Sequence, residues 1–150
     1  MSGTWTIGPA VAGDAAAVGD LLTRQLAEHG LPADRARVDS AVAILLGAPR
    51  HGFLLVARDA ATVIGVAFVA MHWSLEHGGQ SCWLEELYVL PESRGRGVGR
   101  DLLRAAMLRA RERGCLMMDL EVTADHARAA HLYAREGFRA LPRERWVREL

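Results

Sequence analysis

A glycine- and arginine-rich turn between a predicted strand and a predicted helix constrains this chain more than any other feature. Residues 83–90 are bulky and β-favouring, and they end at Pro91. From Leu102 to Ala110, apolar residues recur with the spacing of a helix that packs on one side. The turn, residues 94–100, reads Arg-Gly-Arg-Gly-Val-Gly-Arg, and its glycines leave backbone amides open at the start of that helix. Because a helix N-terminus favours negative charge, the turn predicts a phosphate-binding site.

Two common phosphate-binding motifs do not fit this turn. The dinucleotide fingerprint G-x-G-x-x-G requires glycine where the chain has Arg100. An acid does follow about 20 residues later, at Asp119 or Glu121, but only about 50 residues remain after the turn, too few for the usual βαβ units. A P-loop needs G-K-[ST], and the chain contains no lysine.

The rest of the chain predicts one mixed α/β domain. A length of 150 residues and a hydrophobic content of 51% suit a single domain, residues 1–150, with a full core. Helices are expected to begin near Asp14 and before Val38, and to cover residues 98–113 and 125–136. Strands are expected at residues 4–7, 53–58, 62–73, 83–90, 115–122, 138–141 and 146–150.

The charge is unevenly distributed although the formal net charge is zero. Residues 1–90 carry 5 arginines against 9 acidic residues, and residues 91–150 carry 13 against 9. A basic second half suits a polyanionic ligand and an acidic first half suits a cationic one, although single charges are usually solvated surface. Arginines crowd residues 94–113, but no nucleic-acid motif accompanies them, so no nucleic-acid partner is expected.

Cysteine usage and hydropathy indicate the compartment. Cys82 and Cys115 form no C-x-x-C pair, and free thiols in a reducing cytosol are expected. No signal peptide is apparent, and the apolar runs at 41–46 and 66–71 are too short to cross a bilayer. A cytoplasmic protein without a membrane partner is expected. The histidine spacings do not suit a metal site, so no metal is expected.

The strand followed by R-x-x-G-x-G resembles the acetyl-CoA motif of the GCN5-related N-acetyltransferase (GNAT) superfamily. Residues 132–138, Leu-Tyr-Ala-Arg-Glu-Gly-Phe, resemble the family's L-Y-x-x-x-G-F, and the order of predicted elements is also the family's. The resemblance implies an α/β (α+β) GNAT fold, with a mixed six- to seven-stranded sheet, splayed central parallel strands and about four helices. It also implies acetyl-CoA as the acyl donor and a homodimer.

The resemblance assigns the cofactor contacts by position. In the family, splayed strand amides bind the pantetheine arm and the glycine turn wraps the pyrophosphate. Many members have asparagine where this chain has His126, whose imidazole would donate a similar hydrogen bond. The implied coenzyme A contacts are Leu87, Tyr88, Val89, Arg94, Gly95, Arg96, Gly97, Val98, Gly99, Arg100 and His126.

Acetyl transfer to an alkyl amine needs a base, because the amine arrives protonated at neutral pH. Glu85 and Glu86 are consecutive and are expected to point to opposite faces of the strand. The run L-E-E-L-Y-V resembles L-E-D-F-F-V of the diamine (spermidine/spermine) acetyltransferase branch, which implies Glu85 as base or amine ligand. Glu86 is the second candidate, and a carboxylate at the surface rim is the simpler alternative. Tyr133 matches the family tyrosine that protonates the leaving thiolate; otherwise it is a core tyrosine.

The expected function is direct acetyl transfer from acetyl-CoA to a primary amine, most simply a small cationic amine such as a polyamine, diamine or amino-acid side chain. Protein N-termini, lysines or aminoglycosides are alternative acceptors. A non-catalytic acetyl-CoA-binding regulatory module is a different class of answer. The acceptor is expected at the first helical hairpin and at the loop before the central strand, with Glu28, His29, Asp34, Glu76 and His77 as candidates.

Overall fold

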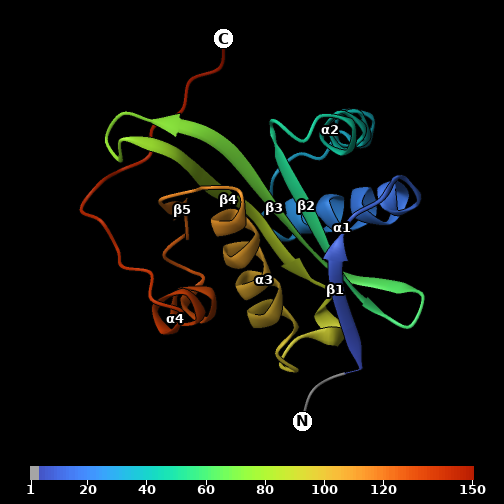
Figure 1. Cartoon of the computed structure of the whole chain (residues 1–150). Coiled ribbons are helices and arrows are strands. Elements are labelled where there is room, and N and C mark those ends of the chain that lie inside the picture. The colour runs from blue at the N-terminus through green and yellow to red at the C-terminus, as the bar shows by residue number, and fades with distance from the viewer. Residues whose placement is uncertain (1–3) are drawn as a thin grey trace.

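A computed structural model describes residues 4–150 as a five-stranded mixed sheet with helices on both faces (Figure 1). The α/β fold class predicted from the sequence is confirmed. The strands are β1 (Trp5–Pro9), β2 (Gly52–Asp59), β3 (Thr62–Ser74), β4 (Gly79–Val89) and β5 (Met118–Leu120). The α-helices are α1 (Ala15–Glu28), α2 (Arg35–Gly47), α3 (Val98–Glu112) and α4 (Ala127–Arg135), and two 3-10 turns are η1 (Ala12–Asp14) and η2 (Pro91–Ser93).

The sheet follows the order β1-β2-β3-β4-β5, and its last two strands are parallel. The first four strands pair antiparallel in sequence order. The parallel pair is short, because β5 pairs with β4 only from Cys82 to Leu84. Beyond Leu84, β4 continues to Val89 with a partner on the β3 side alone. The predicted splayed parallel strands are therefore confirmed. We call the unpaired edge of β4 after Leu84, on the β5 side, the opening.

A β-bulge lies in β4 at the start of the opening. Val69 of β3 pairs with Leu84 while its neighbour Phe68 pairs with Glu86, so Glu85 is the extra residue. The insertion breaks the strict alternation of side chains along β4. Glu85 is exposed, whereas Glu86 is partly buried.

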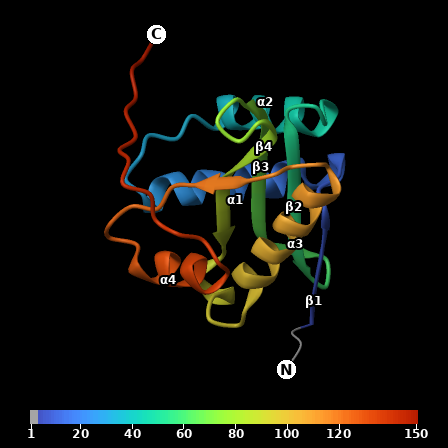
Figure 2. The ribbon, with the colours of Figure 1, turned by 60° about the vertical axis from the view of Figure 1, so that its left-hand side comes forward.

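Each face of the sheet is covered by helices, as Figures 1 and 2 show. The stripe of α3 predicted from the sequence is buried, and Leu102 and Leu103 are fully enclosed. Val89 of β4 faces this helix, since it approaches Gly99. Its neighbour Tyr88 points to the other face, where it meets α1. Successive β4 residues thus reach the two helical layers in turn.

The sheet has five strands, so the expectation of six to seven was wrong. Residues 138–141 and 146–150 form no strand. Pro142 has no amide to donate to a ladder, and ion pairs such as that of Arg143 with Glu76 hold the segment instead. The segment runs outward past the β3–β4 turn, with most of its side chains exposed (Figure 1).

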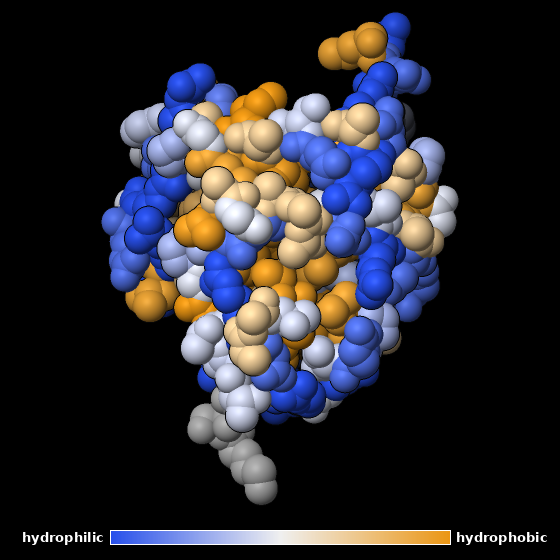
Figure 3. Space-filling model, turned by 90° about the vertical axis from the view of Figure 1, so that its right-hand side faces the viewer, coloured by the Kyte–Doolittle hydropathy of each residue, from blue (hydrophilic) through white to orange (hydrophobic). Residues whose placement is uncertain are grey.

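The outer surface near β1 lies away from the opening. Figure 3 shows this face, where apolar atoms gather in a central hollow bordered by polar side chains. Within residues 4–150, none of the helices combines the length and the apolar character needed to cross a bilayer.

Close packing of β3 under α3 generates a stability prediction. A Cβ at Gly65 would lie 2.9 Å from Leu102 Cδ1 and 3.1 Å from the carbonyl oxygen of Tyr88. Gly65→Ala should therefore lower the free energy of unfolding by about 1–3 kcal/mol in urea denaturation. At Gly47, the last residue of α2, no atom lies within 4 Å of a Cβ, so Gly47→Ala should leave the free energy of unfolding unchanged or raise it by up to about 1 kcal/mol. Equal effects of the two substitutions would contradict this packing.

Candidate active site

The turn between β4 and α3 exposes a row of backbone amides. Gly95 and Gly97 have φ angles of 77° and 98°, which residues with a side chain rarely adopt. The amides of Gly95, Arg96 and Gly97 donate to no acceptor within residues 4–150. The first three amides of α3 have no carbonyl one turn back, and they lie at the positive end of its dipole. The predicted phosphate-binding turn therefore has the free donors that an anion requires.

The arginines of this turn are engaged with carboxylates of the protein itself. Each predicted phosphate ligand has one acidic partner: Arg94 pairs with Glu28 at 2.8 Å, Arg96 with Asp59 at 3.2 Å and Arg100 with Asp101 at 3.2 Å. These pairs neutralise the guanidinium groups and hold them to the fold. Each guanidinium keeps further N–H donors, whereas the amides of residues 95–97 have no partner at all within residues 4–150.

Glu28, at the end of α1, ties this helix to the turn. Tyr88 Oη donates to Glu28 Oε1 at 2.6 Å, and Arg94 Nη2 donates to both carboxylate oxygens at 3.0 and 2.8 Å. Burial works against ionisation of Glu28, but the hydrogen bonds from Tyr88 and Arg94 outweigh it and lower the pKa of Glu28. Burial and the bond to Glu28 raise the pKa of Tyr88 to about 12. Glu28, one of the expected acceptor ligands, is thus occupied by an internal contact.

The edge of β4 along the opening presents unpaired amides. Leu90 donates its amide to Ile64 of β3 at 2.9 Å. Because neighbouring residues of a strand direct their amides to opposite sides, the amide of Tyr88 also faces β3, and those of Leu87 and Val89 face the opening. The carbonyl of Val89 also faces the opening, and its oxygen accepts a hydrogen bond from Arg94 Nε at 2.8 Å. Two of the three predicted backbone positions therefore line the opening.

Glu86 is the partly buried carboxyl of the pair at the bulge. Burial, followed by the charge of Glu85, raises the pKa of Glu86 to about 7, and the neighbouring Gln25 of α1 lowers it by a smaller amount. A carboxyl with a pKa close to neutrality can accept a proton and release it again under physiological conditions. Glu85, the first choice from the sequence, is exposed on the bulge. The bulge is the reason why Glu85 is exposed and Glu86 is partly buried, and no local sequence pattern indicates the bulge.

Tyr133 lies within electrostatic reach of Glu86. It belongs to α4, which follows β5, whereas Glu86 belongs to β4. Burial, and then the charge of Glu86, raise the pKa of Tyr133, so the phenol remains protonated. Its ring packs edge-on against Phe138 with the centroids 5.8 Å apart. A proton acceptor on β4 and a proton donor on α4 thus influence each other's charge.

His126 lies where α1 and α4 meet. Its ring centroid is 4.9 Å from that of His29, the residue after α1, and its Nδ1 shares a hydrogen bond with Thr123 Oγ1. Figure 2 shows the two helices approaching each other at this side of the molecule. The contact of His126 with the cofactor stays a prediction. The structure adds that the His126 ring links the start of α4 to the end of α1 through His29.

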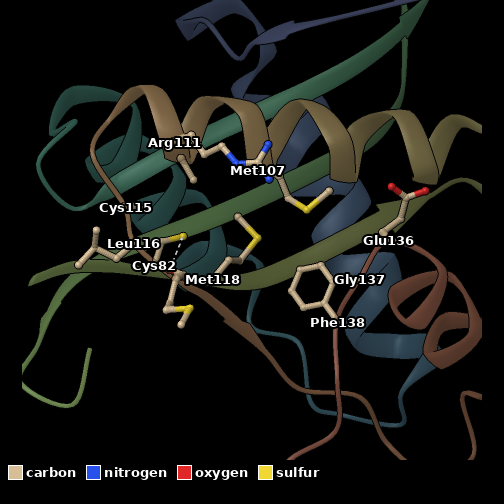
Figure 4. A pocket seen from close by; sticks show the side chains of 11 residues that line it. Cys82, Met107, Arg111, Cys115, Leu116, Met118, Glu136, Gly137 and Phe138 are labelled. Carbon is tan, nitrogen blue, oxygen red and sulfur yellow. Dashed lines mark hydrogen bonds between the residues drawn. The ribbon is translucent and has the colours of Figure 1, made fainter. Parts of the chain in front are cut away.

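A cavity of about 280 Å³ lies between α3 and the paired part of β4 and β5. Figure 4 shows Met107 and Met118 at this cavity, with Phe138 as the wall that also packs against Tyr133. Burial raises the pKa of the Cys82 thiol in its lining to about 12, so this thiol is not a ready nucleophile. The cavity therefore adjoins the proton donor without supplying a reactive group of its own.

A sheet that opens between its parallel strands, beside a turn with free amides, is the architecture of an acyl-transfer domain of the GNAT fold. The sequence model of the acetyltransferase (GNAT) family matches residues 17–138, and the chain belongs to that family. Members of this family use acetyl-CoA, which agrees with the donor expected from the sequence.

Three known proteins illustrate the relationship. The chain is 41% identical over 88 residues to a mycothiol acetyltransferase of Propionibacterium freudenreichii, a match that spans 57% of this chain but only 27% of that protein. It is 30% identical over 131 residues to the N-acetyltransferase YjgM of Escherichia coli (strain K12), spanning 83% of this chain and 76% of that one. An aminoglycoside N-acetyltransferase in complex with CoA superposes with a TM-score of 0.84 over 97% of this chain and 94% of that chain, at 20% identity. The last comparison shows the fold alone.

The left-handed glycines of the turn generate a binding prediction. Gly97→Ala forces a side chain into a φ of 98° and places its Cβ 3.3 Å from Arg100 Nη2. The resulting distortion of the turn should weaken acetyl-CoA binding by about tenfold or more in calorimetry, because the amides must converge on one anion. Gly78→Ala is the matched control: its φ is 73°, but it lies in the β3–β4 turn with no atom near its Cβ. Equal loss of affinity in both variants would show that strain, and not the turn, is responsible.

Proposed function

We propose that this chain is an acetyl-CoA-dependent N-acetyltransferase that transfers the acetyl group directly to a primary amine. The placement of Glu86 on β4 and of Tyr133 on α4 carries this proposal. A proton acceptor and a proton donor within electrostatic reach of each other, next to free strand amides, are what such a transfer requires.

The donor would be held mainly by backbone groups. The amides of residues 95–100 suit the pyrophosphate, since they are unpaired and lie at the N-terminus of α3. The amides of Leu87 and Val89 suit the pantetheine arm and the acetyl oxygen, because they face the opening. Bound acetyl-CoA supplies an acetyl thioester, whose C–S bond breaks as a C–N bond to the amine forms.

Glu86 and Tyr133 would manage the protons of this exchange. An alkyl ammonium group has a pKa of about 10.4, so the amine must lose a proton before it can attack. Ionised Glu86 accepts that proton, directly or through water, and Tyr133 donates its phenolic proton to the departing sulfur. Formation of the C–N bond leaves a second proton on the nitrogen, and this proton passes to the Tyr133 phenolate, directly or through water, as the amide forms. Glu86 returns its proton to solvent, so the transfer releases one proton overall. Neither cysteine is needed as a nucleophile.

The proposed acceptor is a small cationic amine of the polyamine, diamine or amino-acid type. Two neighbouring carboxyls, Glu85 at the surface and Glu86 within, favour a positively charged ligand at the mouth of the opening. The local resemblance to the diamine branch supports the same class. An assay of thiol release over a panel of diamines, polyamines, amino acids, peptides and aminoglycosides tests it. Release of coenzyme A with none of these amines would instead indicate a binding module.

We also propose a homodimer that works in the cytoplasm. The outer edge of β5 is unpaired within residues 4–150, and Trp146, Val147 and Leu150 of the C-terminal segment are almost fully exposed. Apolar groups and a free strand edge of this kind favour association with a second copy. Cys82 and Cys115 are free thiols, which agrees with a reducing compartment. Light scattering of the purified chain tests the oligomeric state.

The bulge generates a paired prediction on catalysis. Glu86→Gln should lower kcat/KM by about 10²- to 10⁴-fold, because the variant cannot accept a proton. In the wild type, kcat/KM should fall as the pH drops below about 7, since the raised pKa of Glu86 leaves the carboxyl protonated there. The matched variant Glu85→Gln should mainly raise the KM for the amine and move the acid limb of the pH profile to lower pH, because it removes a charge that contributes to the raised pKa of Glu86, without abolishing turnover. The reverse pattern would return the base role to Glu85.

The proton donor is tested by removing one oxygen atom. Tyr133→Phe keeps the ring contact with Phe138 and should lower kcat by about 10- to 1000-fold. Acetyl-CoA affinity, measured by calorimetry, should change little because the turn is untouched. Turnover at the wild-type rate would exclude Tyr133 as the acid.

A further inference from the structure

We propose that Arg128 of α4 is the cationic ligand of the donor's pyrophosphate and clamps it against the glycine turn. This inference rests on the proposed function, because it concerns the same bound donor. No feature of the sequence singles out Arg128, which is one of thirteen arginines in residues 91–150. The structure brings it to the turn, since a Cβ at Gly95 would lie 3.5 Å from Arg128 Nη2.

Charge balance distinguishes Arg128 from the arginines of the turn and from Arg104. The three arginines of the turn each pair with a carboxylate of the chain, namely Glu28, Asp59 and Asp101. Arg104 of α3 is likewise paired with Glu136, at 2.9 Å. Arg128 forms no ion pair with any residue from 4 to 150, and it is exposed. It therefore offers a full positive charge and five N–H donors beside the free amides.

The two sets of donors approach the turn from different elements. The amides of residues 95–100 belong to the β4–α3 connection, whereas the guanidinium comes from α4. A pyrophosphate held between them is contacted by backbone dipoles and by a charged fork, the pairing that phosphate geometry favours. Binding of the donor would then connect α4 to the turn.

This connection bears on Tyr133, which lies further along the same helix. No residue of α4 is fully buried, and its C-terminal end is held by the ion pair of Arg104 with Glu136 and by the contact of Tyr133 with Phe138. Arg128 lies in the first turn of α4, at the opposite end. The bound phosphate would secure that end, so Arg128 is a binding residue that also positions the helix carrying the proton donor.

Calorimetry with three donor fragments tests the phosphate contact. Arg128→Ala should weaken binding of CoA and of dephospho-CoA, which lacks only the 3′-phosphate, by about 10- to 100-fold each. Binding of S-acetylpantetheine, which contains no phosphate, should not change. Loss with CoA alone would assign Arg128 to the 3′-phosphate, and equal loss with all three ligands would assign it a purely structural part; either result overturns the proposal.

Arg135→Ala is the matched control for Arg128→Ala. Arg135 is also exposed on α4, about two helical turns after Arg128 and on nearly the same face. Its substitution therefore removes the same charge at a distance from the glycine turn. The Arg135→Ala variant should bind CoA with the affinity of the wild type. Arg128→Lys should recover part of the affinity, because it restores the charge without the fork. Wild-type affinity in Arg128→Ala would refute the clamp, whereas failure of the wild type to bind CoA would refute the proposed function itself.

Hydrogen exchange supplies a readout at the helix. CoA should slow exchange of the α4 amides in the wild type and in Arg135→Ala, but much less in Arg128→Ala at saturating CoA. Equal protection of α4 in all three proteins would show that Arg128 does not connect the donor to this helix.

Discussion

The loss of pairing between β4 and β5 after Leu84 is the constraint on which the site depends. A strand inside a sheet normally has both edges bonded, and free edges occur at its margins. Here β4 keeps β3 on one side and loses β5 on the other, so that Leu87 and Val89 expose amides close to the sheet centre. The fold accepts these unpaired donors where a ligand with many acceptor oxygens is expected.

The bulge adds side-chain chemistry to this backbone feature. One inserted residue, Glu85, shifts the alternation of β4 just before the opening. Glu86 is thereby partly buried next to α1, where its pKa rises to about 7. Further along β4, Tyr88 is bound by Glu28, which also holds Arg94. Helix α1, strand β4 and the glycine turn are thus joined by one carboxylate.

Local patterns predicted the parts of this protein that local chemistry determines. The glycine turn, the stripe of α3 and the order of the central elements follow from spacing and turn residues, and the structure contains them. The two C-terminal strands were predicted from β-favouring residues alone, but a strand also needs a partner edge, and Pro142 and the ion pairs of the segment oppose one. A strand pattern near a chain end is therefore weak support for an extra strand.

Contacts between residues far apart in the sequence add features of the site that local patterns do not contain. Arg94 lies 66 residues from Glu28, and Arg96 lies 37 from Asp59, so the sequence did not show that these guanidiniums are already paired. The order of preference between Glu85 and Glu86 depends on a register shift against β3, which alternation within one strand does not reveal. Arg128 reaches the turn only through the packing of α4.

The central claim is that the turn and the opening together bind acetyl-CoA through their backbone. Amide resonances of the isotopically labelled protein, followed by NMR during titration with CoA, test it most directly. The largest changes should occur at Gly95, Gly97, Leu87 and Val89, because these amides are free and gain an acceptor. Resonances that stay unchanged there, or changes confined to another surface, would contradict the account.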